Sequence, residues 1–154
     1  MPLRRTLSAL AVSAIAIVAI GCGSDDDSTS TSTAAATTTA PAALTDTVGV
    51  KASEMKFVLT ADTAAAGKVT FNAENVGKVD HEMVVIKTDT PAADLPVKDG
   101  EVSEEGSIGE IGPEELTVGA KVTKAFDMPA GHYALICALP GHYQAGMYAD
   151  FTAK

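Results

Sequence analysis

The chain has 154 residues, which is enough for one ordinary domain and too few for two of common size. Its 20 acidic residues outnumber its 11 lysines and arginines, and the net charge at pH 7 is −9. So acidic a chain offers no basic surface to phosphate groups, and we therefore set nucleic-acid binding aside.

Residues 1–21 have the features of a bacterial lipoprotein signal peptide. Arg4 and Arg5 form a short positive region, and an uncharged apolar run follows up to residue 20. That run is too short to span a bilayer, but it has the length of a signal-peptide core. It ends in the sequence AIGC, which resembles a lipobox, in which the cysteine (here Cys22) is lipidated and becomes the new N-terminus. The alternative is an ordinary secretory signal that is cleaved nearby.

Residues 22–45 are predicted to be the lipidated cysteine followed by a disordered tether. Ser, Thr, Ala, Asp and Pro dominate this segment, which cannot bury enough apolar area to offset its chain entropy. A flexible coil of this length holds a domain roughly 25 Å from its anchor. The sequence therefore predicts an extracytoplasmic protein, lipid-anchored to the outer face of the bacterial cell membrane or periplasmic, with one domain over residues 46–154.

The domain is predicted to be all-β. Short segments rich in Val, Phe and Thr alternate with turn residues. The predicted strands cover residues 47–52, 55–60, 68–75, 82–87, 121–127, 132–137 and 147–153. Seven to eight short strands at this spacing indicate a sandwich or a barrel. The acidic, proline-containing stretch 88–119 is expected to form long loops with at most one helical turn.

Three potential metal ligands lie on one loop near the C-terminus. Cys137, His142 and Met147 follow one another at intervals of five residues, between two predicted strands. With Cys22 lipidated, Cys137 is the one remaining thiol and cannot form an internal disulfide. His81, at the start of a predicted strand, supplies a fourth group. Two imidazoles, a thiolate and a weak axial thioether are the ligand set of a blue-copper electron-transfer site.

Each proposed ligand has a simpler alternative. Cys137 could be a buried structural thiol, His142 an exposed loop residue, and Met147 a core residue that leaves a three-ligand site. The third histidine, His132, competes with His81 for the fourth position. On the strand that leads to Cys137, alternation places His132 on the face opposite the thiol. We therefore interpret His132 as a surface residue.

Residues 46–154 resemble the cupredoxins, the plastocyanin and azurin group of copper proteins. The pattern Asn75-x-Gly77-x-x-x-His81 resembles the first-ligand segment of that family, and the C-x4-H-x4-M loop is similar to that of rusticyanin. The resemblance implies a Greek-key β-sandwich that binds one copper ion near one end. The implied ligands are His81, Cys137, His142 and Met147.

The same resemblance implies a function. It indicates a type 1 (blue) copper protein that acts as a membrane-tethered single-electron carrier, is not an enzyme, and is a monomer. Its partners would be redox proteins of a membrane electron-transport chain. Copper enzymes of this kind need further histidines for other copper centres, and this chain has three histidines in all. The alternative function is extracytoplasmic copper capture and delivery, without an electron relay.

The surroundings of the site carry expectations of their own. Glu82 follows the first ligand, where many cupredoxins carry an Asn that ties the two ligand loops together. The Met-side spacing is one residue longer than that of azurin, so an extra axial ligand from the Asp80 carbonyl is not expected. The Leu139 N–H is expected to donate to the cysteine sulfur. By family analogy, an apolar surface patch around the second histidine includes Pro140 and Tyr143.

Overall fold

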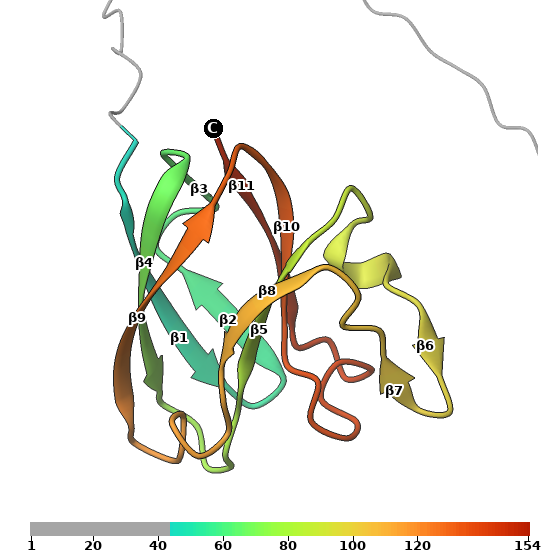
Figure 1. Ribbon diagram of the computed structural model, residues 1–154. Coiled ribbons are helices and arrows are strands. Elements are labelled where there is room, and N and C mark those ends of the chain that lie inside the picture. The colour runs from blue at the N-terminus through green and yellow to red at the C-terminus, as the bar shows by residue number, and fades with distance from the viewer. Residues whose placement is uncertain (1–43) are drawn as a thin grey trace, which may run out of the picture. The chain divides into compact units, whose positions relative to one another are not determined.

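The seven strands predicted from the sequence are all present in residues 44–154, the part of the chain that the computed structural model describes (Figure 1). They are β1 (Thr47–Ser53), β2 (Lys56–Leu59), β4 (Gly67–Asn75), β5 (Met83–Lys87), β9 (Lys121–Met128), β10 (Gly131–Ile136) and β11 (Tyr148–Ala153). The predictions for the signal peptide, for lipidated Cys22 and for most of the tether lie outside the described residues.

The same range contains four further strands, all short, and a single helical turn. They are β3 (Thr63–Ala64), β6 (Val97–Lys98), β7 (Glu101–Val102), β8 (Ser107–Ile111) and the 3-10 turn η1 (Ala92–Asp94). The strand count therefore exceeds the predicted seven to eight. Among the described residues, no helix has the length and apolar character needed to cross a membrane.

The strands form two mixed sheets and a small hairpin. One sheet has the order β2-β1-β4-β9 and the other the order β3-β11-β10-β5-β8, while β6 pairs with β7. Strand β1 runs parallel to β4, and β3 runs parallel to β11. The other pairs are antiparallel. The prediction of an all-β sandwich is confirmed.

The main core lies between the two sheets and follows the alternation of the sequence. In β4, Val69, Phe71 and Ala73 are buried, as their period of two predicts. The ring of Phe71 packs 5.3 Å from that of Phe151 and 6.0 Å from that of Phe126, measured between centroids. These aromatic contacts join β4 and β9 of one sheet to β11 of the other.

The five-stranded sheet is covered on its outer face as well. Strand β5 is buried at four successive positions, because Met83 and Val85 face the main core while Val84 and Ile86 face a second apolar cluster. Residues 88–106 supply the cover for that second cluster through Ala92, Leu95 and Val102. A strand buried on both faces reads as a continuous apolar run, which is how β5 appears in the sequence.

The prediction of long loops over residues 88–119 is partly wrong. It holds for the single helical turn, but β8 joins the edge of the five-stranded sheet and β6 and β7 form a hairpin. Strand β8 leaves little signal in the sequence because only its last residue, Ile111, is buried. It also contains Gly109 at φ 146° and pairs irregularly with β5 between Val85 and Ile86.

Candidate metal centre

The predicted ligands come together where three connections meet at one end of the sandwich. The loops β4–β5, β8–β9 and β10–β11 all lie at the lower end in Figure 1. His81 lies in the first of them, while Cys137, His142 and Met147 belong to the third. The ligand atoms of His81, Cys137 and His142 lie within 4.8 Å of one another. This spacing suits three donors around a single ion.

The thiol and the two imidazoles face each other closely. Cys137 Sγ lies 3.3 Å from His142 Nδ1, and the rings of His81 and His142 are 5.3 Å apart in an edge-to-face arrangement. His81 and Cys137 are fully buried, whereas His142 is half-buried. One histidine therefore connects the buried centre with the surface.

The unpartnered nitrogens of His81 indicate that the centre is built for a metal. Both Nδ1 and Nε2 are buried and have no hydrogen-bond partner among the described residues. An unsatisfied buried polar group costs about 1–3 kcal/mol, so proteins rarely keep two on one side chain. A metal ion satisfies such a nitrogen, and copper suits imidazole and thiolate donors. The residues present therefore fit copper.

Burial sets the protonation of both buried ligands. It lowers the pKa of His81, and the neighbouring His142 adds to this effect, so the neutral imidazole with its free lone pair is favoured. Burial raises the pKa of the Cys137 thiol, while the backbone N–H groups of Glu82 and Leu139 act in the opposite direction. The Leu139 N–H therefore acts on the sulfur in the direction expected of a donor, and a bound metal would displace the thiol proton.

Backbone hydrogen bonds place Met147 beside the other ligands of its loop. The Cys137 N–H donates to the Met147 carbonyl over 3.0 Å, and the Met147 N–H donates to the His142 carbonyl over 3.1 Å. Met147 is fully buried and belongs to the main core. Its thioether role in copper binding stays a prediction.

Asn75 organises the segment that carries His81, a role that the sequence analysis missed. Its Nδ2 group donates to the carbonyls of Val79 (2.8 Å) and Leu116 (2.9 Å), and its Oδ1 accepts from the Gly77 N–H (2.9 Å). The side chain is 1% exposed. The spacing Asn-x-Gly, typical of an Asx turn, is the signal that could have revealed it.

Gly77 and Glu54 complete the support of this segment. The Glu54 carboxylate accepts a hydrogen bond from the Lys78 N–H, which links the β1–β2 turn to the His81 loop. A Cβ atom on Gly77 would lie 3.2 Å from His81 Nε2 and 3.0 Å from a Glu54 carboxylate oxygen. A larger residue at position 77 would therefore have to displace the imidazole or the Glu54 carboxylate slightly.

Glu82 follows His81, at the position where many cupredoxins carry an Asn. Its side chain is buried, which raises the pKa of the carboxyl. The backbone N–H groups of Ala138 and Leu139, in the loop that follows Cys137, act in the opposite direction by hydrogen bonding to the carboxylate. Nearby Glu110 and Glu104 add repulsion that raises the pKa further. The Glu82 carboxyl thus lies near enough to the loop after Cys137 for the N–H groups of that loop to affect its pKa.

Two expectations about neighbouring residues have opposite outcomes. His132 does lie on the face opposite Cys137, where its ring contacts the Thr88 carbonyl (2.7 Å) and Asp150 (3.0 Å). The inclusion of Tyr143 in a surface patch is wrong, because its side chain is only 5% exposed and packs in the second apolar cluster. Pro140 is exposed, as expected.

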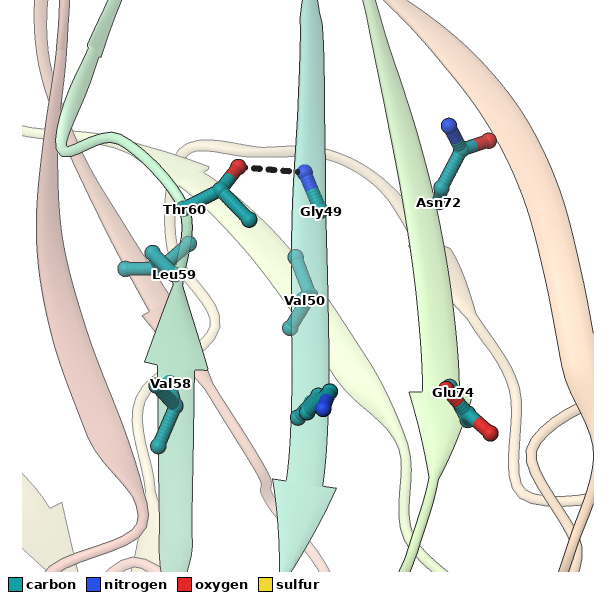
Figure 2. A pocket seen from close by; sticks show the side chains of 8 residues that line it. Gly49, Val50, Val58, Leu59, Thr60, Asn72 and Glu74 are labelled. Atoms are coloured by element: carbon teal, nitrogen blue, oxygen red, sulfur yellow. Dashed lines mark hydrogen bonds between the residues drawn. The ribbon is translucent and has the colours of Figure 1, made fainter.

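A separate hollow of about 350 Å³ lies on the outer face of the four-stranded sheet (Figure 2). It arises beside Gly49, whose N–H donates to the Thr60 hydroxyl over 2.8 Å. A Cβ on Gly49 would come within 2.8 Å of the Thr60 methyl group. None of the four predicted ligands lines this hollow, so it is not part of the metal centre.

Comparison with known proteins identifies the family whose model this chain matches. Residues 23–154 match the family model of the sulfocyanin (SoxE) domain. No curated protein sequence matches the chain.

Solved structures support the fold. Auracyanin from Roseiflexus castenholzii has a TM-score of 0.56 at 20% identity, over 72% of this chain and 98% of its own. Auracyanin B has a TM-score of 0.54 at 23% identity, over 70% of this chain and 88% of its own. Auracyanin A, described as a "blue" copper protein from Chloroflexus aurantiacus, has a TM-score of 0.51 at 28% identity, over 70% of this chain and 98% of its own.

Proposed function

This chain belongs to the sulfocyanin (SoxE) domain family and is a type 1 copper protein, and from this premise we propose that it carries single electrons while a lipid on Cys22 tethers it to a membrane. The membership places it among the cupredoxin electron carriers and not among enzymes. The observation that carries the proposal is the convergence of His81, Cys137 and His142 within 4.8 Å at the end of a β-sandwich.

His81, Cys137, His142 and the Met147 thioether would hold the copper ion. When bound, copper supplies a one-electron couple between Cu(I) and Cu(II). The protein keeps the donors in place through Asn75 on one side and through the short backbone bonds of the 137–147 loop on the other. Full burial of His81 and Cys137 excludes water from them. Fixed, dry donors keep the reorganisation that accompanies electron transfer small.

The half-buried imidazole of His142 is the proposed contact point for redox partners. At the same end of the domain, Val76, Val79 and Val118 are 50%, 41% and 53% exposed. Their loops are joined, since the Val118 N–H donates to the Asp80 carboxylate over 3.0 Å. Exposed apolar side chains of this kind support brief docking by a partner protein.

The lipid tether is supported by sequence alone. The AIGC sequence that ends at Cys22 favours lipidation, and the segment up to residue 45 gives the domain reach. A Cys22→Ser variant should move the protein from the membrane fraction to the soluble fraction. Membrane association that survives this change would contradict lipidation at Cys22.

Copper delivery to an acceptor protein is the alternative function. Such a role requires the protein to surrender its metal. The complete burial of His81 and Cys137 favours retention, because both ligands must be uncovered before an acceptor can reach them.

A visible absorption spectrum tests the proposal directly. After addition of Cu(II) and desalting, the chain should show an intense thiolate-to-copper band that bleaches with ascorbate and returns with ferricyanide over repeated cycles. Cys137→Ser should remove the band while the sandwich stays folded. A colourless chain that binds only Cu(I), or one that loses its metal on cycling, would instead support copper delivery.

A further inference from the structure

The loop that carries His142 has one fully buried side chain, that of Tyr143. Of residues 138–146, all of which the structure describes, only Tyr143 is buried. The hydrogen bonds of its neighbours are local, such as His142 N–H to the Leu139 carbonyl (3.0 Å) and Gly146 N–H to the Tyr143 carbonyl (2.9 Å). These local bonds shape the loop, and near its start the half-buried side chains of Leu139 and Ala138 pack against the two apolar clusters.

Tyr143 binds residues 88–106, the segment that covers the outer face of the five-stranded sheet. Its hydroxyl donates to the Ala92 carbonyl over 2.8 Å and accepts from the Leu95 N–H over 3.0 Å. Its ring packs against Tyr148, with 5.3 Å between centroids. The hydroxyl therefore acts both as a donor and as an acceptor. Ala92 lies in the η1 turn, and Leu95 is the residue that follows this turn.

A second, exposed contact joins the same two segments. Gln144 Nε2 donates to the Gly100 carbonyl, in the β6–β7 turn, over 2.6 Å. The ligand loop therefore meets the covering segment at two places along its length.

The covering segment is itself anchored to the strands on either side of the ligand loop. The Ala92 N–H donates to the Asp150 carboxylate of β11 over 2.7 Å. The Thr88 carbonyl lies 2.7 Å from the ring of His132 on β10. Tyr143 thus binds a segment that is itself hydrogen-bonded to β10 and β11.

We propose that Tyr143 is a positioning residue, through which residues 88–106 hold the ligand loop from outside and fix His142 relative to Cys137. The inference rests on the proposed copper site. His142 itself is half-exposed, and the next residue, Tyr143, supplies the buried attachment. The expected consequence is a ligand geometry that the protein maintains through each redox change.

Tyr143→Phe tests this role, because it removes both hydroxyl bonds and keeps the packing of the ring. Tyr133→Phe is the matched control. Tyr133 is fully buried in β10, and its hydroxyl donates to the Pro129 carbonyl over 2.6 Å, at the end of that strand away from Cys137. Each variant deletes a phenol–carbonyl bond of a buried tyrosine, and Tyr143→Phe also deletes the bond from the Leu95 N–H. Only the bonds of Tyr143 reach the ligand loop.

The measurements are the visible spectrum, the reduction potential and the rate at which a chelator removes copper from the full chain. Tyr143→Phe should release copper about tenfold faster than the wild type, the factor that corresponds to roughly one to two lost hydrogen bonds. Its thiolate-to-copper band and its potential should shift. Tyr133→Phe should lower the unfolding temperature and leave all three copper properties unchanged.

Equal copper properties in the two variants would overturn the positioning role and leave the copper site itself intact. A wild-type chain without the blue band would overturn the proposed function, and this inference with it. Gln144→Ala keeps the test open if Tyr143→Phe does not fold, because Gln144 is exposed. Gln144→Ala should also speed copper release, by a smaller factor than Tyr143→Phe. An unchanged rate in this variant would count against the proposal that residues 88–106 hold the ligand loop.

Discussion

Replacing Asn75 with alanine removes three hydrogen bonds that hold the first-ligand segment. They join the side chain to Val79, Leu116 and Gly77 over 2.8–2.9 Å. Because Asn75 is 1% exposed, water cannot replace the lost hydrogen bonds. At about 1 kcal/mol for each bond, Asn75→Ala should cost about 3 kcal/mol of the free energy of unfolding. His81, whose N–H donates to the same Leu116 carbonyl (3.2 Å), should also bind copper less tightly.

Equilibrium unfolding in urea, followed by circular dichroism, measures the cost in the copper-free chain. With a slope of about 1–3 kcal/mol per molar urea, the midpoint should fall by roughly 1–3 M. Asn72→Ala is the control from the same strand, because Asn72 is exposed and its Oδ1 accepts one bond from the Thr123 hydroxyl over 2.8 Å. That variant should lose less than about 1 kcal/mol.

Equal midpoints for the two variants would refute the assignment of Asn75 as the organiser of the loop. A large stability loss with unchanged copper affinity would show that the loop holds His81 without help from Asn75. Copper affinity is measured by competition with a chelator of known affinity, so the two readouts are independent.

Three further predictions concern the copper centre. Met147→Leu should keep copper bound and raise the reduction potential, because leucine offers no electron pair to Cu(II); an unchanged potential in voltammetry would show that Met147 is not the axial ligand. Glu82→Gln should raise the potential by an amount on the order of tens of millivolts, since a buried negative charge favours the more highly charged Cu(II), and a fall in potential would contradict this. Removal of copper should lower the unfolding temperature, because the ion binds the native state alone. At a thousandfold excess over its dissociation constant, copper adds about 4 kcal/mol to the free energy of unfolding. Equal unfolding temperatures for the two forms in calorimetry would contradict a preformed site.

The sequence predicts the strands and the ligand loop 137–147 because both depend on short-range patterns, while His81 is added by the ligand set that the family resemblance implies. Alternation in β4 identifies Val69, Phe71 and Ala73 as core residues, and they are buried. The same parity argument separates His132 from Cys137. Cys137 and His142 are five residues apart on one loop, and the Cys137 Sγ lies 3.3 Å from the His142 Nδ1.

The surroundings of the centre could not be predicted in the same way, because they depend on contacts between distant segments. Tyr143 looks like a surface residue in its loop, and its burial depends on Ala92 and Leu95, some fifty positions earlier. The sequence shows only that Glu82 replaces the expected Asn. The effect on its carboxyl of the Ala138 and Leu139 N–H groups depends on the position of the Cys137 loop. Neither fact is present in local sequence.

The position of the centre in the topology explains why its support comes from both sheets. His81 lies in the connection from β4, in the four-stranded sheet, to β5, in the five-stranded sheet. The remaining ligands lie between β10 and β11 of the five-stranded sheet. The distance between His81 and Cys137 therefore depends on how the two sheets pack. Asn75 and Glu54 fix the His81 side, while Tyr143 and residues 88–106 fix the other. Loosening either side should weaken copper binding even where no ligand is changed.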